Sequence, residues 1–410
     1  MKKKIDVKQL ELGMYVAELD RSWLESPFLF QGFKLANEKD LKTLVDLCEF
    51  VYVDVDKSDF RDFEARRRFI EGSGQDEATT KVNLKLRPPK TFEDEIEEAR
   101  QVHQDAEGYI SKVFENLRLG EPLQVEEAKV IVSEMINSIM RNPDALLLLS
   151  NLKAYDEGAV THSMNVCTMA LTFGRFLGLD KNQMHELGFA ALLHDIGETK
   201  VPKHILEKRF GLSPEEVQQM QSHVELGAEI LRQQKEIPAS AIDVAYSHHE
   251  RINGSGYPRK LQGDAISFFA KIIAILDVYD RLTHAAKHNR YVTSTNALKN
   301  MYDYRGRFFD SELIEKFIQC LGIYPVGSVV ELNSGEVGVV ISISPENHLL
   351  PKLMLVRDKQ KKPIYPPTIL NLMHYKGEGG SRYSIAKVLQ PNAYGIDLKK
   401  YMLREFSFSA

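Results

Sequence analysis

The chain has 410 residues, of which 43% are hydrophobic and 27% are charged, and its formal net charge is -5. This length suggests two or three domains, and the composition is that of an ordinary globular protein. The negative net charge excludes a general basic surface for DNA or RNA, so an anionic ligand would need a local positive site such as metal ions.

The cysteines and the apolar runs indicate a cytoplasmic protein. The three cysteines, Cys48, Cys167 and Cys320, are far apart and form no CxxC pair, which is typical of reduced thiols. No apolar run near the N-terminus has signal-peptide length, and none elsewhere reaches the roughly 18 residues of a membrane span. We therefore expect no interaction with a membrane.

Residues 1–70 predict a small N-terminal domain of strands plus one helix. Short apolar runs such as MYVAEL and FVYVDV alternate with turn signals, and the helix is expected at about residues 38–48. The polar segment that follows, residues 71–91, contains two adjacent prolines and has the composition of a linker.

A long connecting helix is expected over residues 92–124. Apolar residues recur at three- and four-residue spacing from Phe92 to Leu117. This stripe could pair with a second copy of the chain, but we favour packing within the chain. We expect the acidic run EDEIEE at residues 93–98 to be a solvated first turn, where acids complement the helix dipole.

Residues 125–322 have helical periodicity almost throughout and predict an all-helical domain. Ser213, followed by Pro214 and Glu216, is typical of a helix start with a capping box. From residue 323 to residue 410 the period falls to two, and residues 333–335 (Asn-Ser-Gly) predict a turn between two strands. The tail is therefore expected to be a small β appendage.

Imidazoles and carboxylates occur in the helical domain in an order that suits a metal site. His194 and Asp195 end the apolar run GFAALL, and Asp277 follows the apolar run FFAKIIAIL, so each would be buried and would need a partner. The expected ligands are His162, His194, Asp195, His223, His248, His249 and Asp277.

These donor types indicate divalent ions and hydrolytic chemistry. Imidazole and carboxylate without thiolate suit iron, manganese or zinc and do not favour a closed structural zinc site. Two ions a few ångströms apart need a bridging carboxylate, for which Asp195 is the natural candidate. The alternative, in which His248 and His249 are ordinary core or surface histidines, becomes weak once the other ligands are counted.

The order H…HD…H…HH…D, with HHERINGSGYP at residues 248–258, resembles the HD-GYP family of HD-domain metal-dependent phosphohydrolases. The resemblance covers about residues 140–325. The start of the chain, KKKIDVKQLELGMYVAELDRSWLESPFLFQGF, resembles a small domain of unknown function that precedes HD-GYP domains. The predicted fold is multidomain α+β, with an all-α HD-type helical domain, a small N-terminal α/β domain and a small C-terminal β appendage.

The resemblance implies a phosphodiesterase that hydrolyses cyclic di-GMP to pGpG, with further hydrolysis to GMP left open, through a hydroxide activated by two divalent ions, iron or manganese. One ion would be held by His162, His194, Asp195 and Asp277. The other would be held by Asp195, His223, His248 and His249. The opening of the site would be lined by Arg251, Gly254, Gly256, Tyr257 and Pro258.

Two positions depart from the family pattern. The family usually has HD-x-G-K, with its lysine near the substrate phosphate, whereas HDIGETK has Glu198 there and Lys200 two residues later. Either Lys200 reaches the site and acts in catalysis with Asp195, or activity is weakened. The third metal ligand of some members falls at Gly158, with Glu157 one position off, so we expect two ions.

We therefore expect an enzyme whose partner is the small molecule cyclic di-GMP. Two alternatives stay open: a weak or inactive module that binds metals and dinucleotide and signals through protein partners, and a phosphohydrolase of another nucleotide. Homodimer formation also stays open. We expect His185, His204, His284 and His288, which match no ligand position, to be ordinary surface histidines.

Overall fold

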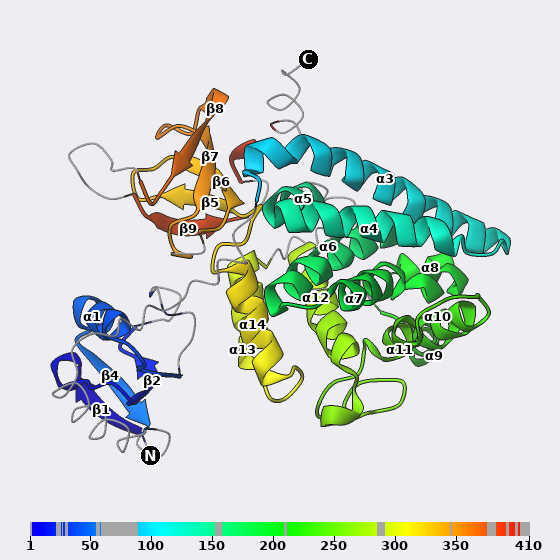
Figure 1. The fold of residues 1–410 in the computed structure, drawn as a ribbon, viewed down its shortest axis with the longest axis horizontal. Coiled ribbons are helices and arrows are strands. Elements are labelled where there is room, and N and C mark those ends of the chain that lie inside the picture. Colours follow the sequence, from blue (N-terminus) through cyan, green and yellow to red (C-terminus); the bar gives the residue numbers. More distant parts are fainter. Residues whose placement is uncertain are drawn as a thin grey trace. The chain divides into compact units, whose positions relative to one another are not determined.

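The computed structural model divides the chain into two units, Met1–Leu84 and Lys85–Ala410 (Figure 1). The described residues are 2–21, 26, 28, 32–54, 58, 89–151, 158–208, 211–284, 292–344, 347–374, 383–390, 393–397 and 401. The expected linker at residues 71–91 lies outside them except for its last three residues.

The first unit is a four-stranded antiparallel sheet with one helix packed on it. The strand order is β1-β4-β2-β3, and α1 (Glu38–Leu47) begins after Asn37, whose side chain accepts a hydrogen bond from a backbone N–H of the first turn. Buried Val16, Leu44 and Val51 belong to one core that joins helix and sheet. The strands are β1 (Lys2–Asp6), β2 (Tyr15–Leu19), β3 (Phe33–Lys34) and β4 (Phe50–Asp54).

The second unit begins with α3 (Phe92–Leu119), the long helix predicted from the apolar stripe. The side chain of Thr91 caps its first turn, and Gly120 ends it in the left-handed conformation, at φ 84°. The helix therefore ends before the predicted limit at residue 124. Its stripe is buried against other helices of the same unit, as the favoured reading predicted.

The helices that follow form the helical domain around α6 (Ala159–Leu177), which packs against α3, α4, α5, α7, α12 and α14. The remaining α-helices of the described residues in this unit are α4 (Val125–Arg141), α5 (Pro143–Asn151), α7 (Lys181–Leu193), α8 (Lys203–Leu206), α9 (Pro214–Gln221), α10 (His223–Arg232), α11 (Ala239–Ser247), α12 (Phe268–His284), α13 (Ser294–Asp303) and α14 (Ser311–Leu321). The predicted capping box at Ser213 is confirmed at the start of α9.

Glu95 corrects the expectation that the acidic start of α3 is solvated. Its side chain is fully buried and accepts hydrogen bonds from the Arg141 guanidinium at 2.7 and 2.8 Å and from the Ser138 hydroxyl at 2.9 Å. Glu95 lies three residues after Phe92 and therefore on the apolar face. Because a buried carboxylate needs a partner, the ion pair ties α3 to α4.

The second unit ends in a five-stranded antiparallel sheet of order β8-β7-β6-β5-β9. Its strands are β5 (Val329–Leu332), β6 (Val337–Ser342), β7 (Lys352–Arg357), β8 (Pro363–Asn371) and β9 (Ile385–Leu389). The predicted turn joins β5 to β6, with Gly335 at φ 98°. β6 packs on α5, where the Ser342 hydroxyl donates to Asp144 at 2.7 Å. The predicted fold class is thus confirmed.

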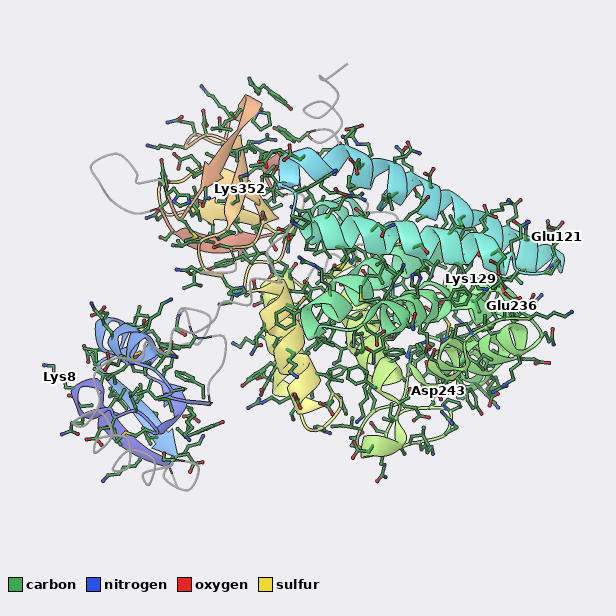
Figure 2. The ribbon with its side chains drawn as sticks, viewed as in Figure 1. Lys8, Glu121, Lys129, Glu236, Asp243 and Lys352 are labelled. Carbon is green, nitrogen blue, oxygen red and sulfur yellow. The ribbon has the colours of Figure 1, made fainter. Side chains whose placement is uncertain are left out.

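Charged surface side chains also link elements of the helical domain. The Lys129 amine on α4 lies 2.7 Å from the Glu236 carboxylate, which follows α10 (Figure 2). Among the described residues, every helix is too short or too polar to span a bilayer.

Candidate metal centre

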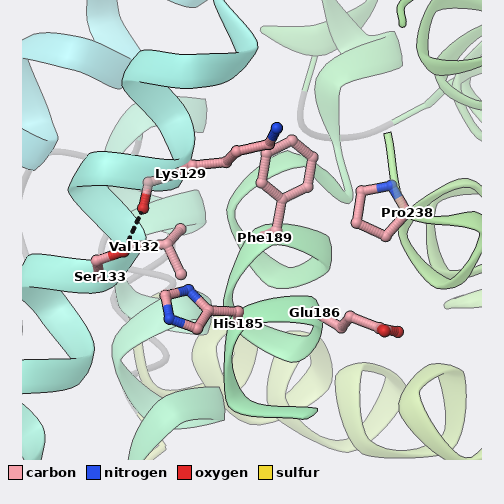
Figure 3. Close-up of a pocket in the computed structure, with 7 residues that line it drawn as sticks. All are labelled: Lys129, Val132, Ser133, His185, Glu186, Phe189 and Pro238. Carbon is pink, nitrogen blue, oxygen red and sulfur yellow. Dashed lines mark hydrogen bonds between the residues drawn. The ribbon is translucent and has the colours of Figure 1, made fainter. Parts of the chain in front are cut away.

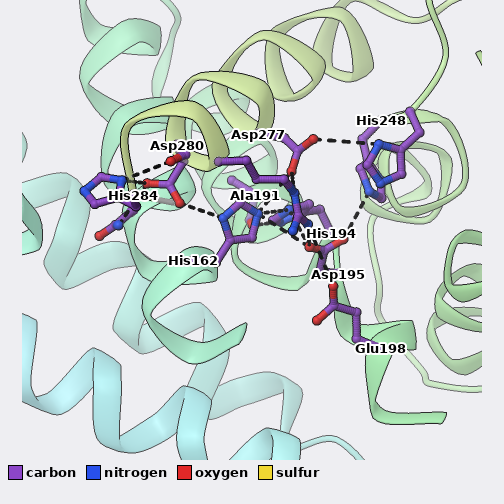
Figure 4. Close-up of polar contacts among 12 residues, drawn as sticks. His162, Ala191, His194, Asp195, Glu198, His248, Asp277, Asp280 and His284 are labelled. Carbon is purple, nitrogen blue, oxygen red and sulfur yellow. Dashed lines mark hydrogen bonds and ion pairs between the residues drawn. The ribbon is translucent and has the colours of Figure 1, made fainter. Parts of the chain in front are cut away.

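The predicted metal ligands come from five helices whose ends or faces meet in one cluster (Figure 4). His162 lies in the first turn of α6, and Asp277 lies on α12, although the two are 115 positions apart in sequence. The others are at helix termini: His194 and Asp195 follow α7, His223 begins α10, and His248 and His249 follow α11.

The ligand atoms form two groups of four that share the carboxylate of Asp195. Within each group, all ligand atoms lie within 4.8 Å of one another. The first group is His162, His194, Asp195 and Asp277. The second group is Asp195, His223, His248 and His249. The structure therefore brings together the two sets implied by the sequence resemblance.

Asp195 is fully buried and turns one carboxylate oxygen toward each group. Its Oδ2 is 3.4 Å from His194 Nε2 and 3.5 Å from His162 Nε2. Its Oδ1 is 3.1 Å from His248 Nε2 and 3.3 Å from His223 Nε2. A carboxylate in this position can bridge two ions.

His249 lies between the two groups. Its Nδ1 is 3.7 Å from Asp277 Oδ2, which belongs to the first group, although the ligand-atom distances put His249 in the second. We assign it to the second group, because 3.7 Å is too long for a hydrogen bond and its ring packs against those of His223 and His248, at 5.0 and 4.2 Å between centroids.

Backbone carbonyls fix the orientation of three of the imidazoles. The Nδ1 atoms donate to carbonyls three or four residues earlier: His194 to Ala191 (2.8 Å), His223 to Met220 (2.7 Å) and His248 to Val244 (3.0 Å). Because a carbonyl oxygen can only accept, each Nδ1 carries a hydrogen, and Nε2 is left as the ligand atom.

This arrangement fits divalent cations. The Nε2 atoms of His162 and His194 are 3.3 Å apart, and those of His223 and His248 are 3.4 Å apart. The buried Oδ1 of Asp195 accepts no hydrogen bond from any described residue. Nitrogen ligands and a carboxylate oxygen that converge in this way need positive charge between them, and these donor types suit divalent transition metals.

The two ligand carboxylates stay ionised. Burial alone would raise the pKa of Asp195, but His194 and Arg281 hold it well below its usual value. Burial would likewise raise the pKa of Asp277, but Arg281 and His162 hold it well below its usual value. Because both carboxylates keep their charge, the cluster attracts cations.

The pKa values of the imidazoles shift in both directions within the cluster. Burial would lower the pKa of His162, but hydrogen bonds with Asp277 and Asp280 raise it to about 10. Burial lowers the pKa of His248 to about 4, against the pull of Asp195. Burial would also lower the pKa of His223, but Asp195 raises it, so the direction differs within the second group as well.

Arg281 is a site residue that the sequence reasoning missed. It lies one turn after Asp277 on α12, and its Nε is 2.6 Å from Asp277 Oδ1 while its Nη2 is 2.6 Å from Asp195 Oδ2. Glu198, in the 3-10 helix η4 (Ile196–Lys200), has its Oε1 3.8 Å from the same Nη2. Burial and the charge of Asp195 raise the pKa of Glu198.

Asp280 was also missed, although it orients a predicted ligand. Its carboxylate binds His162 Nδ1 at 2.7 Å, Asn165 Nδ2 at 2.9 Å and His284 Nδ1 at 2.8 Å. A carboxylate on the remote nitrogen of a ligating imidazole fixes the ring and increases its basicity. The signal was the spacing in DVYD, which places Asp280 one turn after Asp277.

The expectation of four surface histidines is only partly right. His204 is exposed and His185 is half-buried, whereas His288 lies outside the described residues. For His284 the expectation was wrong, because its side chain is only 15% exposed and is bound to Asp280. The i to i+4 spacing of Asp280 and His284 on α12 explains the contact.

Glycines and a buried acid shape the loop after the double histidine. A Cβ at Gly256 would lie 2.4 Å from the carbonyl oxygen of His249, so only glycine fits, and Gly254 has φ 76°. The buried carboxylate of Glu250 accepts two backbone N–H bonds from the far side of the loop, at 2.7 and 3.0 Å. The loop is thus held against the cluster.

Of the predicted loop residues, Tyr257 is the one placed against a ligand. Its ring stacks on that of His249 at 4.8 Å, and its peptide bond to Pro258 is cis. The Arg251 guanidinium donates to the carbonyls of His248 and Glu250, at 3.2 and 2.9 Å. Arg251 is therefore engaged with the loop backbone.

The structure does not bring Lys200 to the cluster. Its amine donates to the carbonyl of Leu117 on α3 at 2.8 Å. Two residues along a 3-10 helix rotate the side-chain direction by about 240°, so Lys200 and Glu198 point to different sides of η4. Gly158 is the N-cap residue of α6, and Glu157 lies outside the described residues.

A pocket of about 280 Å³ opens between α4, α7 and the start of α11 (Figure 3). It is lined by Lys129, Val132, Ser133, His185, Glu186, Phe189 and Pro238. None of these residues belongs to either ligand group. The pocket is thus separate from the metal centre.

Three family models match the chain. The model described as HD domain matches residues 147–313. A domain of unknown function, DUF3391, matches residues 2–128, and a KOW domain associated with HD domain matches residues 329–396. The fold and the cluster of imidazoles and carboxylates thus define an HD-domain protein with two appended modules.

Relatives of the chain are named as phosphodiesterases of cyclic dinucleotides. A protein of Pseudomonas aeruginosa named as a cyclic di-GMP phosphodiesterase is 33% identical over 378 residues, 91% of this chain and 89% of that protein. A cyclic di-GMP phosphodiesterase of Thermotoga maritima is 27% identical over 63% of this chain and 69% of that protein. A 3'3'-cGAMP-specific phosphodiesterase of Vibrio cholerae is 31% identical over 51% of this chain and 38% of that protein.

The chain therefore belongs to the HD-GYP family of HD-domain phosphohydrolases.

Proposed function

We propose that this protein is a metal-dependent phosphodiesterase that hydrolyses cyclic di-GMP to pGpG, with GMP as a further product to be tested. The observation that carries the proposal is the pair of four-ligand groups that share the Asp195 carboxylate. The names of the relatives from Pseudomonas aeruginosa and Thermotoga maritima favour cyclic di-GMP as the substrate.

Two divalent ions bound by the two groups would supply an activated hydroxide and would stabilise negative charge on the phosphodiester. The chain's own residues position those ions. Asp195 bridges the groups, and the imidazoles present Nε2 atoms whose direction their hydrogen bonds fix. Iron and manganese fit a donor set of imidazole and carboxylate without thiolate.

The loop from residue 251 to residue 258 would hold the dinucleotide over the cluster. Gly254 and Gly256 let the backbone fold close to the double histidine. Tyr257, stacked on His249 and joined to Pro258 by a cis peptide bond, offers an aromatic face or a hydroxyl to the substrate. Arg251 acts by holding the loop backbone in place.

A second candidate function is hydrolysis of another cyclic dinucleotide. The relative from Vibrio cholerae is named as specific for 3'3'-cGAMP, and the same ligand set would serve either substrate. A third candidate is a weakly active module that binds the dinucleotide and signals through partners, and the carboxylate of Glu198 near the cluster motivates it.

The deciding experiment measures turnover of cyclic di-GMP and of 3'3'-cGAMP by protein purified without oxygen and loaded with Fe²⁺ or Mn²⁺. Products are separated by chromatography. The Asp195→Ala variant removes the shared ligand, and Asp105→Ala, on an exposed part of α3, serves as the matched control.

We expect pGpG from the loaded protein and from Asp105→Ala and none from Asp195→Ala. Faster turnover of 3'3'-cGAMP would favour the second candidate. A protein that binds two ions and retains the dinucleotide without product under either metal would contradict the proposal and favour the signalling module.

A further inference from the structure

The guanidinium of Arg281 lies where a cation would be expected in the first ligand group. It contacts one oxygen of Asp195 and one of Asp277, each at 2.6 Å. Both carboxylates are ligands of the first group. A group with a full positive charge at this distance satisfies the two buried carboxylates electrostatically.

Arg281 approaches only one side of the cluster. The Asp195 oxygen that it binds, Oδ2, faces His162 and His194, whereas the other oxygen faces the second group. Among the described residues, no ion pair or hydrogen bond joins Arg281 to an imidazole of the second group. Any competition with a metal ion should therefore concern the first group.

The positive charge of Arg281 also lies close to the negative charge of Glu198. The Glu198 carboxylate lies beside the cluster and would repel an anionic substrate. Arg281 Nη2 is 3.8 Å from Glu198 Oε1. The Arg281 side chain is 46% exposed, so it can reach solvent and an arriving ligand. The guanidinium on α12 thus offsets the negative charge that Glu198 on η4 places beside the cluster.

We propose that Arg281 is a mobile cation with two positions. It neutralises Asp195 and Asp277 before the first group binds metal, and it contacts the substrate phosphate once metal is bound. The second position rests on the proposed function, whereas the first does not.

The physical reason for two positions is competition for the same oxygens. A divalent ion bound by Asp195 and Asp277 would repel a guanidinium held at hydrogen-bond distance from both carboxylates. The long side chain of arginine can swing away from them, and Glu198 keeps the guanidinium near the cluster. A planar guanidinium then suits a phosphate, which it can bind through two parallel N–H bonds.

The first position is tested by titrating metal-free protein with Mn²⁺. The two groups are separated by background variants, because His223→Ala leaves only the first group complete and His194→Ala leaves only the second. The matched control is Arg305→Met, since Arg305 is 38% exposed and its Nε is also 3.8 Å from a glutamate, Glu315.

We expect Arg281→Met to tighten Mn²⁺ binding by about tenfold or more in the His223→Ala background, because the two charge-assisted contacts of Arg281 with Asp195 and Asp277 no longer compete. The shift in the His194→Ala background should be much smaller. Equal shifts in both backgrounds, or no shift beyond that of Arg305→Met, would overturn the first position.

The second position is tested by binding of a slowly hydrolysed phosphorothioate analogue of cyclic di-GMP to Mn²⁺-loaded protein. Arg281→Met should weaken binding by about 10- to 100-fold, as expected for loss of a charged hydrogen bond. Arg281→Lys, which keeps the charge, should lie between Arg281→Met and the unchanged protein. Adding Glu198→Lys to Arg281→Met should restore binding.

The outcomes separate the two proposals. If the unchanged protein neither binds the analogue nor hydrolyses cyclic di-GMP, the proposed function fails, and the Mn²⁺ titration alone decides the role of Arg281 in the metal-free cluster. If the unchanged protein binds the analogue and Arg281→Met binds it equally well, the phosphate contact is refuted while the proposed function stands.

Discussion

Asp280 determines how the first ligand group is held together, although it binds no metal itself in the proposed site. It ties His162 to Asn165 on the same helix and to His284 on its own helix. His162 is the ligand whose remote nitrogen is bound by a side chain, whereas backbone carbonyls serve His194, His223 and His248. The orientation of His162 therefore depends on a single carboxylate.

We expect Asp280→Asn to weaken metal binding at the first group by about 10- to 100-fold, the usual effect of removing a carboxylate behind a ligating histidine. The measurement is a Mn²⁺ titration in the His223→Ala background. Asp303→Asn, on the exposed side of α13, is the control. Equal affinity for the two variants would show that Asp280 does not position His162.

At the residue scale, the sequence predicted which groups meet but not how each one points. The ligands were found because HD, HH and the isolated histidines and aspartate follow apolar runs in a recognisable order. Arg281 was missed because its contact with Asp195 crosses from α12 to the end of α7, which no local spacing reveals. Lys200 was expected to reach the site, but the tight turn of η4 directs its amine to α3.

Gly197 explains the glycine of the HDIG segment at the scale of elements. A Cβ at this position would lie 1.9 Å from the carbonyl oxygen of His223 and 2.5 Å from the N–H nitrogen of Gly227. The backbones of η4 and α10 are therefore in direct contact. This contact sets the distance between Asp195, just before η4, and His223, at the start of α10.

We expect Gly197→Ala to lower the stability of the helical domain by roughly 1–3 kcal/mol or more, because the methyl group must push two backbones apart. It should also weaken metal binding by the second group. Thermal unfolding and a Mn²⁺ titration measure both effects.

Gly108→Ala is the matched comparison, because a Cβ at Gly108 in α3 meets nothing within 4 Å. It should raise stability by about 0.5–1 kcal/mol, the usual difference between alanine and glycine in a helix. If Gly197→Ala behaved like Gly108→Ala, η4 and α10 would not be in rigid contact.

The ends of helices could be predicted where a capping residue or a glycine marks them. Which residues of a helix are buried was harder to predict. Thr91 and Gly120 delimit α3, and the Ser213 box starts α9. The burial of Glu95 was not predictable from composition, because it needs Arg141 from a different helix to compensate its charge.

At the scale of the whole second unit, Asp144 joins the helical domain to the C-terminal sheet. It lies in the first turn of α5 and accepts a hydrogen bond from the Ser342 hydroxyl at the end of β6. Burial raises the pKa of its carboxyl to about 6 from an ordinary value of 3.8, despite the bonds from Ser342 and Ile343. The interface therefore binds the Asp144 proton more tightly than the unfolded chain does.

This shift predicts a pH dependence of stability. Between about pH 4 and pH 6 the folded protein keeps the Asp144 proton while the unfolded chain has released it, so stability falls as pH rises through this interval, by roughly 3 kcal/mol in total. The Asp144→Asn variant should lack this slope. The difference in unfolding midpoint between variant and unchanged protein, followed from pH 4 to pH 7, should therefore increase in favour of the variant. A constant difference would contradict the shift.

The layers of the molecule could be predicted, but the pairing of its last strands could not. After residue 323, apolar residues alternate with polar ones, and this alternation predicted strands. The turn at Gly335 predicted the β5–β6 hairpin. β9 instead returns to pair with β5 on the far side from β6, a long-range contact that the spacing of local residues does not specify.

The hydrogen bonds from His194, His223 and His248 to backbone carbonyls affect how the site can change by mutation. No single substitution deletes a main-chain carbonyl. A change in a neighbouring side chain therefore leaves the hydrogen bonds that orient these three rings in place. The ring of His162 is oriented by a side chain instead, and a single substitution at Asp280 can remove that hydrogen bond. Laboratory evolution toward a different metal should accordingly accumulate its first substitutions around His162.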